Sequence, residues 1–315
     1  MKKIIILIPI LTILLSGCYD MTDIEDIETV TTVYNEPKKI TYCTVTTIPD
    51  EKKYGYRLYT CETSDLFEGI NEISLKTGKK ISVAHLDSII FMKDCEPPLI
   101  KEVCTSAVDG SDFHPKIMTA FSDMSSDDFF AKLSVPDDTV LYRHISDVFH
   151  NKYAVVPQCT VIELYRSLQN ESPGVNLPVF TLDTDGNITS DGICHVSYNK
   201  TGFFHSDFAE TVNLLENRGK PIYYNSDGEI ISVTLTDGNV EYDKDRNFIM
   251  LYMEIHTDIG GEEIEEHTIK LIKEKITSDT VKICNEKNNG FDILNLSREM
   301  LKKFISEEEF NRYKE

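Results

Sequence analysis

The chain has 315 residues, of which 41% are hydrophobic and 27% are charged, so it holds enough apolar material for two or three packed domains. Its 53 acidic and 32 basic residues give a formal net charge of −21. A field of this sign repels nucleic-acid phosphates, and it argues against a peripheral protein that basic residues hold on anionic lipid. Attachment to a membrane would therefore need a separate anchor.

The first residues have the layout of a lipoprotein signal peptide. Lys2 and Lys3 precede the apolar run 4–15, which as a helix spans about 18 Å and is too short for a bilayer core of about 30 Å. The residues that follow resemble a lipobox: Leu15, Ser16, Gly17 and Cys18. We expect residues 1–17 to be removed and the Cys18 thiol to carry diacylglycerol, because two acyl chains give stable anchoring.

An ordinary secretory signal peptide that happens to contain a cysteine is the alternative interpretation. The order of basic start, apolar run and lipobox favours the lipoprotein. Processing would also remove Lys2 and Lys3, which leaves 30 basic and 53 acidic residues and a formal charge of −23. The lipid then becomes more necessary for membrane attachment.

After the signal peptide, residues 18–37 begin acidic and predict a short tether. The pattern of β-branched and apolar residues then predicts an N-terminal region over 38–175, built from two α/β subdomains. Its expected elements are strands at 40–47 and 54–61, a helix at 65–76 ended by Gly78, an apolar strand-like run at 81–92, a helix from Pro97 or Pro98 to Gly110, a strand at 116–121, and helices at 129–133, 141–149 and 160–168.

Residues 170–177 combine Ser, Pro, Gly and Asn, which indicates a boundary, and a C-terminal domain is expected over 176–315. Asp-Gly pairs at 185–186, 191–192, 227–228 and 237–238 predict hairpin turns, because Gly tolerates positive φ. The expected elements are strands at 179–182, 192–198, 222–224, 229–235 and 248–255, and helices at 207–215, 262–276 and 297–313. The fold class is α+β, with mixed sheets, helices, and antiparallel hairpins in the C-terminal half.

Seven cysteines remain after Cys18, an odd number with wide spacing and no C-x-x-C pair. Most lie beside apolar residues, so we expect buried free thiols. One disulfide can form across neighbouring strands, for example between Cys43 and Cys61. The cysteines that remain are Cys43, Cys61, Cys95, Cys104, Cys159, Cys194 and Cys284.

Enzyme and metal signatures are missing from the sequence. It has no nucleotide-binding glycine motif, no G-x-S-x-G and no H-E-x-x-H. The segment 183–187 resembles a calcium loop but lacks the required glycine, and an Asp-Gly turn explains it better. Four clustered glutamates predict the solvated face of a helix rather than an acid–base pair: Glu262, Glu263, Glu265 and Glu266.

Several motifs resemble the Ger(x)C family, the GerAC-like spore germination lipoproteins. The strongest likeness is at the start of the mature chain, and it rests on Tyr19, Asp20, Ile24, Glu25 and Asp26. Weaker likenesses follow in the family's order. They are Ala84-His85-Leu86 within 81–91, Gly192-Ile193-Cys194, Ser197-Tyr198-Asn199-Lys200 with Gly202, Glu210-Thr211 with Leu214-Leu215, and Gly290-Phe291-Asp292-Ile293-Leu294.

The chain departs from the family pattern at two motifs. Tyr19 stands where the family usually has Trp, and Leu294-Asn295-Leu296 replaces the late Gly-Phe-Gly. These differences indicate a divergent member and leave the exact partner and germinant open.

The resemblance implies a three-domain α/β fold and a non-catalytic C subunit of a nutrient germinant receptor. It implies a complex with two integral membrane subunits, of A and B type, at the outer face of the spore inner membrane. We expect no catalytic residue, metal or cofactor. A solute-binding lipoprotein of a transporter shares the anchor but would show two α/β lobes around a hinge, and a cell-surface hydrolase would need a convergent carboxylate pair.

Overall fold

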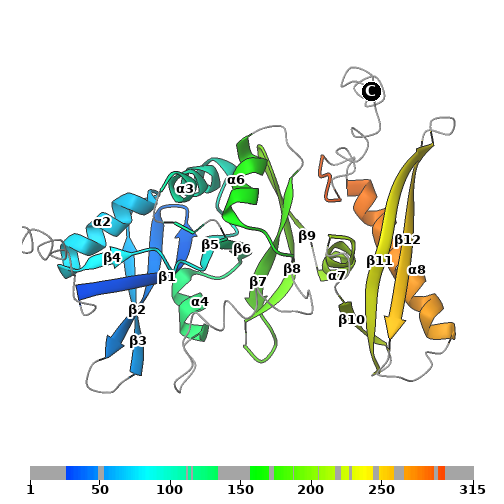
Figure 1. Ribbon diagram of the computed structural model, residues 1–315, viewed down its shortest axis with the longest axis horizontal. Coiled ribbons are helices and arrows are strands. Elements are labelled where there is room, and N and C mark those ends of the chain that lie inside the picture. Colours follow the sequence, from blue (N-terminus) through cyan, green and yellow to red (C-terminus); the bar gives the residue numbers. More distant parts are fainter. Residues whose placement is uncertain are drawn as a thin grey trace, which may run out of the picture.

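The computed structural model describes residues 26–48, 53–110, 113–114, 116–133, 157–169, 174–186, 188–204, 206–216, 221–226, 229–243, 248–258, 266–286 and 290–294. These residues form an elongated body with two sheets (Figure 1). One is a mixed sheet of nine strands and the other an antiparallel sheet of three strands. The expected α+β class with mixed sheets is confirmed.

The nine-stranded sheet has a parallel centre and antiparallel edges. Strands β1, β5, β6 and β7 run parallel side by side, β2 and β3 extend one edge, and β8 and β9 extend the other. The short β4 pairs with the start of β1. The strands are β1 (Ile27–Glu36), β2 (Lys39–Ile48), β3 (Lys53–Cys61), β4 (Lys80–Ser82), β5 (Ser88–Met92), β6 (Met118–Ser122), β7 (Val175–Leu182), β8 (Ile188–Ser197) and β9 (Lys200–Phe204).

Helices cover both faces of this sheet. On one face α2 (Leu66–Thr77), α3 (Pro97–Asp109) and α6 (Val161–Gln169) build the larger core, and on the other α4 (Ser126–Leu133) builds a smaller one. Successive strand residues point to opposite faces, so Tyr42 belongs to the first core and Cys43 to the second. Burial on both faces fixes the register of the central strands.

Helix α2 shows how local sequence sets the elements. Asp65 caps its start by accepting hydrogen bonds from the backbone N–H groups of Phe67 and Glu68, and Gly78 ends it with a left-handed φ of 69°. Gly69 lets the helix approach the sheet, because a Cβ there would lie 2.2 Å from the hydroxyl oxygen of Tyr42. The helix expected at 65–76 is confirmed.

The three-stranded sheet lies toward the other end of the body (Figure 1). It consists of β10 (Pro221–Ser226), β11 (Glu229–Asp243) and β12 (Phe248–Asp258). Helices α7 (Ser206–Glu216) and α8 (Glu266–Asn285) pack together with β11 in a separate apolar cluster. Its buried members are Leu214, Ile231, Val233, Leu235, Ile272 and Ile276.

Elements of the large sheet lie across two of the expected boundaries. The tether expected over 18–37 contains β1, which is the central strand around which β2, β4 and β5 assemble. Because β1 is buried on both faces, its sequence lacks the alternation of polar and apolar residues that would have indicated a strand. The boundary expected at 170–177 includes the start of β7, and the same sheet continues across it to β9.

Some turns and ends also differ from the expectation. Asp191 and Gly192 lie opposite Val179 as a bulge within β8, and Asp237-Gly238 lies within β11, so neither pair forms a hairpin turn. The run 81–92 divides into β4 and β5, and the helix expected at 262–276 is observed at 266–285. The helices expected at 141–149 and 297–313 lie outside the described residues.

Candidate functional site

The predicted lipidation site lies just upstream of the described structure. Cys18, the lipobox and most of the family motif lie outside the described residues, whose first member is the exposed Asp26. Strand β1 begins at the next residue, Ile27. Eight residues from Cys18 to Asp26 span at most about 28 Å when fully extended. A lipid on Cys18 would therefore be coupled closely to the centre of the large sheet.

A buried carboxylate holds the start of β1 in place. The side chain of Glu28 is fully buried, and its Oε1 lies 3.0 Å from Nη1 of Arg57 and 3.4 Å from Nζ of Lys79. The hydroxyl of Thr44 donates to its Oε2 at 3.1 Å. These partners come from β2, β3 and the turn between α2 and β4, so one side chain connects four parts of the fold.

The environment of Glu28 favours its ionised form. Burial by itself raises the pKa of this carboxyl. Hydrogen bonds from Tyr59, Thr44 and Lys79, together with the charge of Lys79, outweigh burial, so the pKa lies below its ordinary value. The group is a structural anion rather than a proton donor. Glu28 has no recognisable sequence motif, because its partners are brought together only by the strand register.

The late family motif meets the segment that opens the C-terminal region. The ring of Phe291 packs on Gly202, where a Cβ would lie 2.6 Å from the ring, and contacts Phe204 edge-on. Nζ of Lys200 lies 6.0 Å from the centre of the same ring. Ile293 is buried with residues of β8, α7 and α8: Ile193, Val212 and Ile283. Motifs about a hundred residues apart in the sequence therefore form one apolar cluster.

A polar network lies beside this cluster. Asn176 donates through its Nδ2 to Glu216 at 2.6 Å and to the backbone carbonyl of Ile293 at 2.9 Å. Its Oδ1 lies 2.8 Å from Nδ1 of His195 and can only accept, so that nitrogen carries the proton. Burial lowers the pKa of His195 to about 4. The imidazole is therefore neutral near pH 7, and the network fastens β7 and β8 to the late motif.

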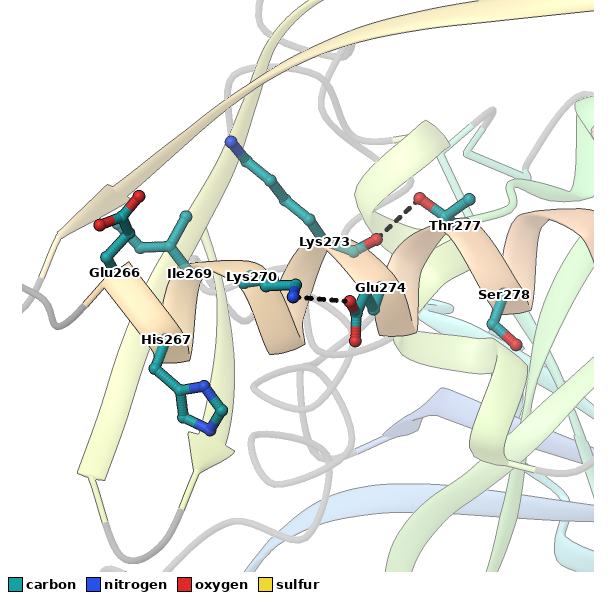
Figure 2. A pocket seen from close by; sticks show the side chains of 8 residues that line it. All are labelled: Glu266, His267, Ile269, Lys270, Lys273, Glu274, Thr277 and Ser278. Carbon is teal, nitrogen blue, oxygen red and sulfur yellow. Dashed lines mark hydrogen bonds and ion pairs between the residues drawn. The ribbon is translucent and has the colours of Figure 1, made fainter.

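A shallow hollow runs along the outer side of α8, and Figure 2 shows its lining side chains. Lys270 Nζ lies 3.8 Å from Glu274 Oε1, and the hydroxyl of Thr277 donates to the carbonyl of Lys273 at 2.7 Å. The lining residues that the structure describes all come from this helix: Glu266, His267, Ile269, Lys270, Lys273, Glu274, Thr277 and Ser278. Glu266 is exposed as expected, while Glu262, Glu263 and Glu265 lie outside the described residues.

None of the described cysteines forms a disulfide. Cys43 and Cys61 are both unpaired, and they belong to the cores on opposite faces of the sheet, so the disulfide suggested between them is not formed. Burial raises the pKa of Cys61 to about 11 and of Cys43 to about 12. The prediction of buried thiols holds for six positions: Cys43, Cys61, Cys95, Cys104, Cys159 and Cys194.

Two kinds of feature are absent from the described residues. Within them, no group of three or more His, Cys, Asp or Glu side chains is placed to hold a metal ion. No helix in the same ranges is both long and apolar enough to cross a membrane.

Comparison with known proteins identifies the family. A family model described as the spore germination protein N-terminal domain matches residues 11–182, which is more than half of the chain. No curated protein and no solved structure matched. The chain belongs to the GerAC-like family of spore germination proteins, as its motifs indicated. The match covers the end of the apolar run, Cys18 and the large sheet from β1 to β7.

Proposed function

We propose that this protein is the lipid-anchored, non-catalytic C subunit of a nutrient germinant receptor. Residues 1–17 are removed, and diacylglycerol on Cys18 holds the body at the outer face of the spore inner membrane. There it assembles with two integral membrane subunits, of A and B type. The observation that carries the proposal is the family match, which begins at residue 11 and so includes the lipobox and strands β1 to β7 of the large sheet.

The short connection between Cys18 and β1 supports this role. Tethering raises the local concentration of the body near its membrane partners, so a weak interface is sufficient for assembly. The formal charge of −21 gives no electrostatic hold on an anionic membrane, and this makes the acyl chains the main source of attachment.

The anchor is tested by changing Cys18→Ala in the full-length precursor expressed in sporulating cells. We expect the variant to leave the membrane fraction and nutrient-triggered germination to fall. Cys284→Ala is the matched control, because it also removes one thiol but leaves the lipobox intact. Retention of the Cys18→Ala protein in membranes, or a mature N-terminus free of acyl chains in mass spectra, would contradict the anchor.

The partners are tested by affinity purification of the tagged protein from detergent-solubilised spore membranes. Two multi-spanning subunits should co-purify with the acylated protein. Co-purification of a transporter instead would favour the solute-binding alternative.

A further inference from the structure

An exposed leucine marks the surface beside the tether. Leu75, in the last turn of α2, is 87% exposed, the highest value among the exposed large hydrophobic residues in the described part of the chain. A single exposed leucine has no meaning by itself. The position of Leu75 matters because it is close to the start of β1: α2 leads directly into β4, and Lys80 of β4 pairs with Ile27.

The turn that carries Leu75 is fixed in place. The N–H of Gly78 donates to the carbonyl of Ser74 at 2.9 Å, and the Ser74 hydroxyl donates to the carbonyl of Lys79 at 2.7 Å. The side chain of Lys79 then reaches Glu28 on β1. Leu75 is therefore held at the end of the body where the tether joins, and Figure 1 shows this end, with α2, β4 and the start of β1, opposite the three-stranded sheet.

The same surface carries a group of cations in an acidic protein. Three lysines lie in or beside the turn: Lys76, Lys79 and Lys80. Lys76 pairs with Glu72, and Lys79 shares Glu28 with Arg57, while Lys80 forms no ion pair with the described residues. The chain as a whole carries −21, and the tether itself is acidic. An anionic bilayer therefore repels most of the protein, and these lysines are the groups at this end that its phosphates attract.

We propose that this tether-proximal surface, defined by Leu75, Lys76, Lys79 and Lys80, rests on the lipid bilayer. Leu75 enters the boundary between headgroups and acyl chains, and the lysine ammonium groups meet lipid phosphates. Lysines can lay their stems on apolar surface while keeping their charge at the headgroups. The three-stranded sheet then points away from the membrane. The proposal rests on the proposed lipidation of Cys18, since a tether of eight residues keeps this end nearest to the bilayer.

The chain has no tryptophan, so one introduced residue gives an unambiguous signal. We would place acylated, full-length Leu75→Trp protein in vesicles of phosphatidylcholine with phosphatidylglycerol. Emission should move to shorter wavelength on vesicle binding, and lipids brominated near the headgroup should quench it. Val281→Trp is the matched control, because Val281 is 56% exposed on α8 at the far end and should show neither effect. Circular dichroism checks that both variants fold.

Vesicle flotation in the same experiment distinguishes failure of the proposed orientation from failure of the lipid anchor. If the Leu75→Trp protein floats with vesicles and its tryptophan emission is neither shifted nor quenched, the orientation is overturned while the anchor stands. If the acylated protein does not float, the anchor itself fails. Equal quenching at positions 75 and 281 also overturns the orientation. With Lys76→Glu and Lys80→Glu added to Leu75→Trp, quenching should decrease in the anionic vesicles and stay unchanged in pure phosphatidylcholine.

Discussion

Replacing Glu28 by glutamine tests whether the buried carboxylate fixes the start of β1. The change keeps the shape of the side chain and removes its charge. Arg57 and Lys79 then lose their shared counter-ion, and the hydrogen bond from Thr44 loses its charged acceptor. We expect a less stable fold, with the loss concentrated where β1, β3 and the α2–β4 turn meet.

The magnitude follows from the exposure of the two cations. Removing one partner of a fully buried ion pair costs about 3–5 kcal/mol, because the other charge stays buried. Here the side chain of Arg57 is 55% exposed and that of Lys79 is 26% exposed, so water can solvate both. Each ion pair then contributes roughly 0.2–1 kcal/mol, and changing the acceptor of the Thr44 hydrogen bond from charged to neutral costs about 1 kcal/mol. We expect a total loss of about 2 kcal/mol, or roughly 4–8 °C in Tm.

The loss should depend on pH in one direction. The pKa of Glu28 in the folded protein lies below its ordinary value of 4.5. Its contribution is therefore fully present above pH 4.5 and decreases as pH falls through the lowered folded value. Denaturant unfolding of wild type and Glu28→Gln at pH 7 and below pH 4 should show a difference that shrinks in acid.

Glu62→Gln is the matched control, because Glu62 is an exposed carboxylate just after β3. It should unfold like wild type at both pH values. A Glu28→Gln protein as stable as wild type at pH 7, or a difference that grows in acid, would refute the assignment of Glu28 as the ion that holds β1.

Two further predictions concern the buried polar and sulfur groups. Asn176→Ala removes the donor to Glu216 and to the Ile293 carbonyl, and it leaves the protonated Nδ1 of His195 without its acceptor. The free energy of unfolding should therefore fall by about 2–4 kcal/mol. Asn71→Ala, at an exposed position of α2, should be close to neutral in the same denaturant assay. The six buried cysteines should resist a thiol reagent in the native protein and react after denaturation, because burial holds them as protonated, covered thiols.

Their refuting outcomes are distinct. An Asn176→Ala protein with wild-type stability would show that the network does not fasten the late motif to β7 and β8. Fast labelling of several thiols at native pH would contradict the two cores that bury them. A protein mass lower by two hydrogen atoms under non-reducing conditions would show that a disulfide does form.

Elements bounded by local signals could be predicted from the sequence. Asp65 and Gly78 mark both ends of α2, and Gly186, with a φ of 78°, makes the expected turn between β7 and β8. Strand β1 could not be found this way, because tertiary packing buries it on both sides and even Asn35 is covered. The Asp-Gly pair at 191–192 carries the signal of a turn, but pairing with β7 on both sides of it makes it a bulge.

The candidate site was predictable only in part for the same reason. The late motif around Phe291 can be recognised in the sequence. Its contact with Gly202 cannot, because that contact depends on the path of the chain through β9 and α7. Glu28 carries no local signal, since a single acidic residue before a β-branched run is common. Its structural role depends on the strand register, which places Thr44 opposite both Val30 and Arg57.

With the proposed lipid on Cys18, the position of β1 limits how far the body could move from the membrane. A tether of twenty residues would extend up to about 70 Å, whereas eight residues extend about 28 Å. For a flexible link the effective concentration near a partner falls roughly as the −3/2 power of length, so the shorter link favours contact several-fold. Separation of residues 27–30 from the sheet would add four residues, or about 14 Å, to this reach. The ion pairs of Glu28 oppose that separation, and so the residue that stabilises the first strand also sets the length of the tether we propose.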